Sequence, residues 1–337
     1  MSEEIILKID HLKQYFPVHK KDENGNPLFV KAVDDVSLDI KRGEVIGLVG
    51  ESGSGKSTIA YSVIGMYRPT AGTLLFKGQD LNASGKRSLS MKKDMQIVFQ
   101  DPGSSMNPHQ TIKEILELPL KIHGICRTKE ERFKKIKELL EMVELPESYM
   151  WKTPGAIGGG EKQMVAIARA LACEPEFLIL DEPTSSLDVS IQAKIINMLL
   201  RIRKERNLTY LFITHDLSLM RNIATRVAIL YLGKVAEIAP AEEFFYRPEH
   251  PYTRMLISSI PVVSEEEEAL KPDKIESRGE IPSPVNIPPG CSFHMRCPYA
   301  MDICSREDPV MFSVDEIHRV RCHLCEQNMA GRAGLTP

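Results

Sequence analysis

The stretch "VIGLVGESGSGKST", residues 45–58, decides the fold of this chain. Its apolar first part is typical of a buried strand, and the part from Gly50 onward fits the pattern G-x-x-x-x-G-K-[ST]. Glycines let backbone N–H groups close around phosphate oxygens, while Lys56 supplies a positive charge and Ser57 a Mg²⁺ ligand. The stretch therefore predicts a site for a nucleoside triphosphate and Mg²⁺. The residues assigned to it are Gly50, Glu51, Ser52, Gly53, Ser54, Gly55, Lys56, Ser57 and Thr58.

Polar residues also follow three other apolar segments. In "FLILDEPTSSLD", residues 177–188, Asp181 can hold the Mg²⁺ shell through water, and Glu182 can polarise an attacking water. Gln100 ends "MQIVFQ" and can reach the metal or the water, and His215 follows "LFIT" and can donate a hydrogen bond to the γ-phosphate. Open α/β sheets bind ligands at the carboxyl ends of their strands, so we expect these side chains to complete the site.

The remaining pattern indicates an α/β fold with a mixed sheet. Segments 45–50, 177–181, 209–214 and 226–232 are predicted to be buried parallel strands, and the alternating segments 4–10 and 29–40 an antiparallel region. Helical periodicity in 111–145 predicts a helical subdomain, at about 101–165, inserted into the core. We expect one ATPase domain at 1–247 and an irregular, proline-rich, cysteine-containing extension at 248–337.

Composition excludes several classes. The net charge of −3 over 337 residues is not that of a nucleic-acid binder, whose footprint is strongly basic. No apolar run reaches the roughly 18 residues of a membrane span, and the start "MSEEIILKID" does not resemble a signal peptide. Of the seven cysteines, Cys126 and Cys173 stand apart and are interpreted as packing residues.

The other cysteines form a group near the end of the chain. Cys291, Cys297, Cys304 and Cys322 have the spacing C-x5-C-x6-C-x17-C, and Cys325 follows after two intervening residues. These gaps differ from the short knuckles of common zinc sites, whereas four thiolates suit a [4Fe–4S] cluster. Zinc held with Cys322 and Cys325, or no metal at all, are the alternatives.

The ordered motifs "GESGSGKST", "FQDP", "GGGEKQ", "LDEPTSSLD" and "THD" resemble the ATP-binding subunits of ABC transporters, from about residue 5 to 247. The resemblance implies a head-to-tail dimer in which each of two ATP molecules lies between one chain's phosphate loop and the partner's signature sequence, usually LSGGQ. It places Asp188 in the D-loop that crosses the dimer interface. It also implies that an aromatic residue stacks on adenine, with Phe16 favoured and Tyr15 next.

Further segments resemble the oligopeptide and dipeptide importers, a branch that includes nickel importers. They are "VKAVDDVSLDI", "MQIVFQDPGSSMNP", "EHPYTRMLISSIP" and "IPPGCSFHMRCPYAMDIC". Two features resemble the F-type ATPase subunit of these importers: the long loop before "VKAVDDVS" and the residues "SSMNP" after Gln100. The resemblance implies a peripheral protein at the cytoplasmic face of the cell membrane. Its partners would be a second, non-identical ATPase, two permeases and, indirectly, a peptide-binding protein. In this branch the cysteine pattern of the extension accompanies a [4Fe–4S] cluster.

Three alternatives to peptide import remain at this point. The solute could be nickel or another small molecule; the chain could be a soluble ABC ATPase acting on nucleic acid or ribosomes; or it could be a slow nucleotide-dependent switch. The tandem ATPase domains or long coiled-coil inserts common in soluble ABC ATPases are missing from the sequence. Glu182 argues against a slow switch, whereas Gly158 argues for one.

The stretch "IGGGEKQ", 157–163, stands where the family has LSGGQ-x-Q. Gly158 replaces the serine whose hydroxyl would contact the γ-phosphate, and Glu161 replaces a neutral glutamine; Gly159 and Gly160 keep the backbone amides of the helix start. The missing hydroxyl costs about 1.5–3 kcal/mol, and the carboxylate competes with phosphate for the positive helix end. We therefore expect an asymmetric heterodimer in which this chain supplies the weaker signature. The alternative is that the family tolerates both replacements without consequence.

Overall fold

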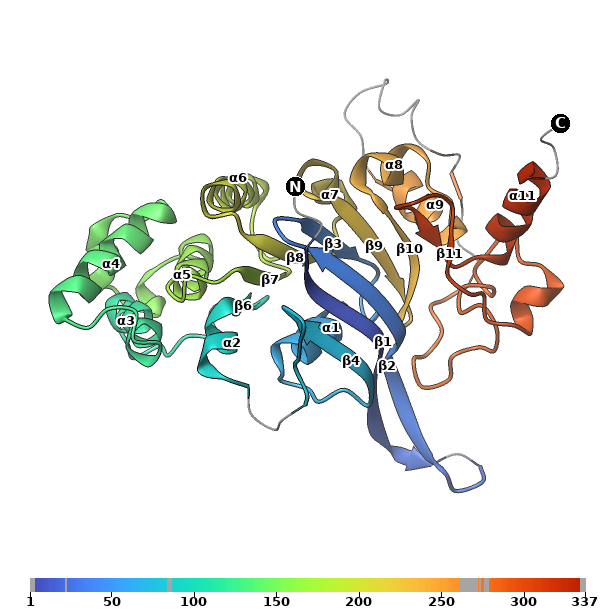
Figure 1. The fold of residues 1–337 in the computed structure, drawn as a ribbon, viewed down its shortest axis with the longest axis horizontal. Helices are drawn as coiled ribbons and strands as arrows, with labels where there is room; N and C mark the ends of the chain where they lie inside the picture. Colours follow the sequence, from blue (N-terminus) through green and yellow to red (C-terminus); the bar gives the residue numbers. More distant parts are fainter. Residues whose placement is uncertain are drawn as a thin grey trace. The chain divides into compact units, whose positions relative to one another are not determined.

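The computed structural model describes residues 4–21, 23–83, 87–260, 272, 274–275 and 279–333 (Figure 1). The chain divides into two compact units. The first comprises Met1–Ile6, Ile40–Val45 and Leu81–Thr214, and the second Leu7–Asp39, Ile46–Asp80 and His215–Pro337. Each unit therefore assembles from segments that are far apart in the sequence.

A parallel sheet forms the core of the first unit. Strands β6 (Met95–Val98), β7 (Phe177–Asp181) and β8 (Thr209–Thr214) lie in the order β8-β7-β6, with Met95 opposite Phe177 and Phe177 opposite Thr209. Every residue of β7 and β8 is buried, as expected for parallel strands covered on both faces. The two strands predicted here, 177–181 and 209–214, are confirmed.

Helices make up the rest of the first unit. They are α2 (Leu89–Asp94), α3 (Ile112–Ile122), α4 (Lys129–Met142), α5 (Gly159–Leu171) and α6 (Val189–Arg206), with short 3-10 turns η1 (Glu147–Trp151) and η2 (Pro154–Ala156). Capping boxes formed by Thr111 with Glu114 and by Thr128 with Glu131 begin α3 and α4. Helix α3 packs against α4 and α5 (Figure 1). The helices that the periodicity of 111–145 predicts are confirmed as α3 and α4.

The second unit contains an antiparallel sheet and a mixed sheet. In the antiparallel sheet the order is β2 (Pro27–Lys41), β1 (Ile5–Lys21), β4 (Ala71–Phe76), β5 (Gln79–Asp80). In the mixed sheet β3 (Val45–Val49) runs parallel to β9 (Arg226–Tyr231), and β9 runs antiparallel to β10 (Lys234–Pro240). Helix α1 (Lys56–Ile64) follows β3, which leaves residues 50–55 as the connecting loop. The antiparallel region is confirmed, although its first strand is longer than predicted.

The C-terminal part of the second unit is more regular than its proline content indicates. Helices α7 (Leu217–Ile223), α8 (Ala241–Tyr246), α9 (Pro251–Ser258) and α11 (His323–Ala333) occur here, with the turn η3 (Asp302–Ser305) and strands β11 (Phe312–Ser313) and β12 (Arg319–Val320). Strand β12 pairs with β10 and extends the mixed sheet. Pro251 stands at the first position of α9, where a backbone N–H would have no partner within the helix, so proline loses no hydrogen bond there. Among the described helices, none combines the length and hydropathy of a membrane span.

A buried ion pair fastens β12 to β10. His318 Nε2 lies 2.7 Å from Glu237 Oε1, and both side chains are almost completely enclosed. Backbone N–H groups of Glu249 and His250 also donate to the Glu237 carboxylate, each at 2.9 Å. Although burial acts to raise it, the hydrogen bond from His318 and these backbone donors lower the pKa of Glu237. The pair raises the pKa of His318 against the opposing effect of burial, so a charged pair is the favoured state.

Candidate ATP site

The phosphate loop lies between β3 and α1, where the sequence predicted it. Gly55 is the N-cap of α1 and has φ 105°, a left-handed conformation that side chains rarely adopt. A Cβ atom on Gly55 would lie 2.1 Å from the Ala32 carbonyl oxygen, and one on Gly50 would lie 2.2 Å from that of Leu230. The loop thus fits against β2 and β9 only with glycine at these positions. From outside the loop, the N–H of Gly233 donates to the Ser54 carbonyl at 2.9 Å.

Lys56 is held inside this loop. Its Nζ donates to the carbonyl oxygens of Gly50 at 2.8 Å and Glu51 at 3.0 Å, and the side chain is only 5% exposed. These oxygens hold the ammonium at the loop that is predicted to enclose phosphates. A lysine so placed offers a point charge without rearrangement of the helix that carries it.

The predicted carboxylates lie in the first unit. Asp181 ends β7 and is completely buried, and Glu182 follows with φ 45°, a left-handed backbone that is rare for a residue with a side chain. Strain of this kind concentrates at functional sites. Gln100, two residues after β6, donates from Nε2 to Glu182 Oε2 at 3.0 Å. The structure therefore brings Gln100 and Glu182 together, as the sequence predicted.

Two other predicted residues lie at the edges of these elements. Asp188 is the N-cap of α6 and accepts hydrogen bonds from the Ile191 N–H at 3.0 Å and the Ser190 hydroxyl at 2.6 Å. The hydrogen bond from the Ser190 hydroxyl makes the largest contribution to lowering the pKa of Asp188, and the bond from the Ile191 N–H makes the next largest. His215 directly follows β8 and is exposed. The phosphate loop belongs to the second unit, whereas Gln100, Asp181 and Glu182 belong to the first.

The glycines of the degenerate signature begin α5. Gly158 is the N-cap without a side chain to cap the helix, and Gly159 and Gly160 form its first turn. Glu161 bends back over this helix start: its Oε2 lies 2.5 Å from the place that a Cβ on Gly158 would take. The Tyr149 hydroxyl is 3.4 Å from Glu161 Oε1. A carboxylate thus stands beside the amides that would receive a phosphate.

The two candidate adenine-stacking residues differ in their surroundings. Tyr15 donates its hydroxyl proton to Asp34, and its backbone N–H donates to Thr70 Oγ1 at 3.0 Å. Burial and the bond to Asp34 raise the pKa of Tyr15. Phe16 makes an edge contact with Tyr67, with 5.1 Å between ring centroids, and is half-buried. Because Tyr15 is engaged with Asp34, Phe16 is the better candidate for stacking.

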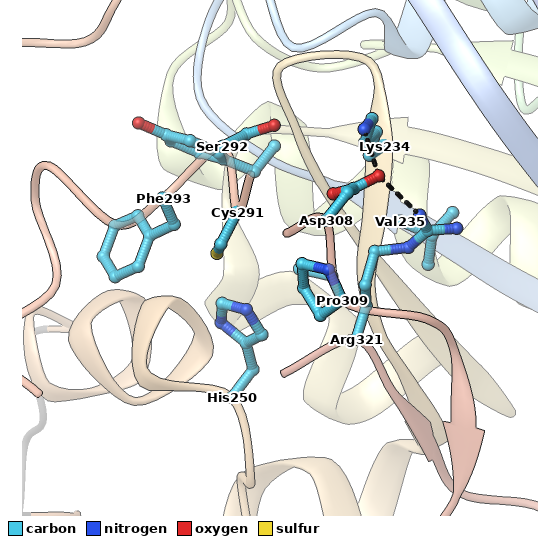
Figure 2. A pocket seen from close by; sticks show the side chains of 11 residues that line it. Lys234, Val235, His250, Cys291, Ser292, Phe293, Asp308, Pro309 and Arg321 are labelled. Atoms are coloured by element: carbon cyan, nitrogen blue, oxygen red, sulfur yellow. Dashed lines mark hydrogen bonds and ion pairs between the residues drawn. The ribbon is translucent and has the colours of Figure 1, made fainter. Parts of the chain in front are cut away.

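The cysteines of the extension lie close together in the second unit. The Cys291 N–H donates to the Cys304 carbonyl at 2.8 Å, an approach that Gly290 permits, since a Cβ there would lie 2.4 Å from the same oxygen. Burial, with a smaller contribution from the charges of Cys322, Cys304 and Cys297, raises the pKa of Cys291 to about 12. Cys291 and His250 point into one small pocket, where Asp308 pairs with Lys234 and Arg321 (Figure 2).

Cys322 and Cys325 share a hydrogen bond between their thiols. The hydrogen bond that Cys325 donates lowers the pKa of Cys322 and raises that of Cys325, whose Sγ lies 3.2 Å from the Glu249 carbonyl oxygen. Elsewhere, Cys173 is buried and burial raises its pKa to about 11, while Cys126 is half-buried. Among the described residues, Glu243, Asp315 and His318 also bring possible metal ligands within 4.8 Å of one another. There His318 is already paired with Glu237, which favours a structural role.

Sequence reasoning missed the residues that hold Glu51. Arg296 forms a two-pronged ion pair with the Glu51 carboxylate, with Nη1–Oε2 at 2.7 Å and Nη2–Oε1 at 3.1 Å. The only sequence signals were an acidic residue inside a loop of small residues and an arginine next to Cys297. Neither signal predicts a contact across 245 positions of the chain.

A glycine-rich loop between a strand and a helix, together with paired acids after a second buried strand, defines a P-loop nucleoside-triphosphatase. The comparisons agree. Residues 33–185 match the family model described as "ABC transporter". The dimeric ATP-binding cassette MJ0796, solved in a post-hydrolysis state bound to ADP and Pi, is 31% identical, with a TM-score of 0.63 over 70% of this chain and 98% of that one. The fold is that of an ABC ATPase.

A second family model and the curated relatives narrow this class. Residues 236–304 match the model described as "Oligopeptide/dipeptide transporter, C-terminal region". The oligopeptide transport ATP-binding protein AppF of Bacillus subtilis is 45% identical over 96% of this chain and 98% of its own length. A putative peptide import ATP-binding protein of Brucella ovis is 47% identical over 87% of this chain and 92% of its own. The chain belongs to the family of peptide-transporter ATP-binding proteins.

Proposed function

We propose that this chain is the ATP-hydrolysing subunit that energises import of oligopeptides or dipeptides. One combination of features carries the proposal. An intact phosphate loop and a Glu182 held by Gln100 occur in the same chain as a C-terminal region that matches that of oligopeptide transporters. Relatives that span nearly the whole chain are named as oligopeptide transport or peptide import ATP-binding proteins, which supports the same solute class.

Each group would then have a defined task in hydrolysis. Backbone amides of the phosphate loop and Lys56 would bind the β- and γ-phosphates, while Ser57, Gln100 and, through water, Asp181 would hold Mg²⁺. Glu182 would polarise the water that attacks the γ-phosphate, and His215 would donate a hydrogen bond to it. Positioning and charge stabilisation account for most catalysis of phosphoryl transfer, so a rigid loop matters more than a reactive side chain.

We propose a peripheral location at the cytoplasmic face of the cell membrane, with two permeases, a second and non-identical ATPase, and indirectly a peptide-binding protein as partners. The ATPase domain would span 1–247, its helical subdomain at about 101–165 would contact the permeases, and 248–337 would form the extension. Relatives named as transport ATP-binding proteins support this arrangement. The helices α3, α4 and α5, which pack on one another, give the subdomain a firm body for such contacts.

The geometry around Gly158 supports the proposed heterodimer. In a head-to-tail dimer this chain's signature serves the partner's ATP, while its own phosphate loop depends on the partner's signature. The missing hydroxyl at Gly158 and the carboxylate of Glu161, folded over the helix start, both weaken the site built on the partner's loop. The site on this chain's own loop is then the hydrolytic one. Asp188 would lie in the segment that crosses the interface.

Restoring the signature tests this pairing. We expect Gly158→Ser with Glu161→Gln to raise the ATP turnover of the purified chain, at high concentration, at least severalfold; a rise of about tenfold would correspond to a regained 1.4 kcal/mol. Gly158→Ser alone should raise the ATP turnover less than the double change, because the new Cβ would meet Glu161 Oε2 at 2.5 Å. Gly155→Ser is the matched control, since a Cβ there meets nothing within 4 Å.

An unchanged turnover in the double variant would contradict the heterodimer proposal under one condition. If the wild-type chain alone already hydrolyses ATP rapidly and the double variant is no faster, the chain works as a self-sufficient homodimer. The heterodimer proposal would then be wrong, while ATP hydrolysis itself would stand.

We further propose that Cys291, Cys297, Cys304 and Cys322 hold a [4Fe–4S] cluster. The donor set fits: Cys297, Cys304 and Cys322 lie near enough to Cys291 for their charges to raise its pKa, and a cationic iron core would relieve that repulsion. Within the described residues, no three cysteines have Sγ atoms all within 4.8 Å of one another, whereas tetrahedral zinc with bonds of about 2.3 Å draws its sulfurs closer. When bound, the cluster would supply cross-links to an extension with little apolar core.

Metal analysis of the anaerobically purified chain tests the cluster. We expect iron and acid-labile sulfide in equal amounts, both lost in Cys297→Ser and kept in Cys126→Ser, the control outside the group. Zinc in place of iron, or no metal, would contradict the proposal.

A further inference from the structure

The second residue of the phosphate loop is held by the C-terminal part of the chain. The Arg296 side chain is 7% exposed and that of Glu51 26%, and both guanidinium prongs engage the two carboxylate oxygens. Such fork-to-fork pairs fix orientation as well as distance. Arg296 directly precedes Cys297, so this contact joins the cysteine-bearing segment to the loop.

A second residue holds the same position. The Tyr252 hydroxyl, at the start of α9, accepts from the Glu51 backbone N–H at 3.2 Å and donates to Glu51 Oε2 at 3.3 Å. The Tyr252 side chain is completely buried. Tyr252 therefore restrains the backbone N–H of Glu51, and Tyr252 and Arg296 together restrain its carboxylate. A residue held at three points has little freedom to change its φ and ψ angles.

Aromatic rings keep the guanidinium in place. The Arg296 Cζ lies 5.7 Å from the ring centroid of Tyr231 and 5.9 Å from that of Phe293. Tyr231, Tyr252 and Phe293 pack on one another with centroid separations of 4.7–5.3 Å. This cluster comes from β9, α9 and the segment after Cys291, so it ties the extension to the core of the second unit.

The restraint continues from Glu51 to the phosphate-binding lysine. Lys56 Nζ donates to the carbonyl oxygen of Glu51, the same residue that Arg296 and Tyr252 hold. From these contacts we infer that Arg296 and Tyr252 are positioning residues of the ATP site, which makes the C-terminal extension part of that site. The inference rests on the proposed ATP site but goes beyond it, because it assigns nucleotide affinity to residues outside the ATPase domain.

Equilibrium titration of the full-length chain with MgATP tests the inference. We expect Arg296→Gln to raise the Kd roughly 10- to 100-fold, the range in which small displacements of positioning groups act. Arg296→Lys keeps the positive charge but loses the two-pronged hydrogen bond, so its Kd should lie between those of Arg296→Gln and wild type. In Glu51→Gln/Arg296→Gln the Kd should be no higher than in the worse single variant, because both changes break one pair.

Arg321→Gln is the matched control. Arg321 lies in the same extension, is buried to a similar degree, and pairs with Asp35 and Asp308 instead of the phosphate loop. It should lower the unfolding temperature while the Kd for MgATP stays within about twofold of wild type, because its partners lie outside the loop.

Three results would overturn the inference. The first is an Arg296→Gln variant, folded by thermal unfolding, that binds MgATP as tightly as wild type. The second is a Kd that rises as much in Arg321→Gln as in Arg296→Gln, which would make the pair a structural anchor only. The third applies if Arg296→Gln does not fold, and it is an unchanged Kd for MgATP in Glu51→Gln. That variant is then decisive, because it removes one charge without changing the shape of the side chain. A wild-type chain that binds no MgATP would instead reject the ATP site itself.

Discussion

Glu182→Gln is expected to lower the rate of ATP hydrolysis by about 10²–10⁴-fold, the usual contribution of a general base, while MgATP still binds. Glu182 directly follows the buried strand β7 and has a strained backbone with φ 45°, and its carboxylate accepts a hydrogen bond from Gln100. Glutamine keeps the size and the backbone but can no longer polarise the attacking water. Because the proposed phosphate contacts come from the loop around Lys56, the Kd for MgATP should change little.

Turnover and binding must be measured separately on the same preparation. Glu205→Gln is the control, since Glu205 is an exposed residue of α6 paired with Arg201 and is remote from the motifs. Wild-type turnover in Glu182→Gln would remove Glu182 from the chemistry. A loss of binding together with turnover would indicate a structural role instead.

Lys56→Ala is expected to weaken MgATP binding roughly 10- to 150-fold, since a hydrogen bond to a charged group contributes about 1.5–3 kcal/mol. The ammonium is nearly buried and already directed to the loop by the carbonyls of Gly50 and Glu51. Removing it takes away the phosphate contact and also the cross-links that shape the loop. Both effects act in the same direction.

Lys56→Arg separates the two effects. Arginine keeps the positive charge but is larger and planar, so in a site this enclosed it should recover only part of the affinity. Titration with MgATP, alongside thermal unfolding, gives both quantities. An unchanged Kd in Lys56→Ala would show that the loop does not bind the triphosphate.

The phosphate loop could be predicted because nine consecutive residues, Gly50 to Thr58, encode its geometry. A buried strand, glycines at fixed spacing and a lysine at the helix start are all local features, although the carbonyl oxygens that exclude a Cβ at Gly50 and Gly55 come from β9 and β2. The carboxylates after β7 could be predicted for the same reason, because the apolar run that ends at Asp181 is continuous. What could not be seen was the backbone strain at Glu182, which depends on tertiary packing.

The C-terminal part was harder to predict. Strands β11 and β12 have two residues each, too few to show an alternating pattern. Strand β12 forms because β10 offers an edge for pairing, and β11 pairs in turn with β12. Helix α9 begins with Pro251, and because proline is favoured at the first helical position but breaks a helix interior, it does not by itself tell a helix start from a break. The contact of Arg296 with Glu51 joins residues 245 positions apart and leaves no periodic signal.

ATP-dependent uptake of an oligopeptide into vesicles tests the central claim most directly, namely that hydrolysis at this chain's own phosphate loop drives peptide import. The vesicles would contain the two permeases, the partner ATPase and this chain, as wild type or Glu182→Gln, with the binding protein supplied. We predict that uptake and ATP turnover fall together by about 10²-fold or more in the variant. Uptake at the wild-type rate with Glu182→Gln would contradict the account, because transport would then run on the partner's site alone.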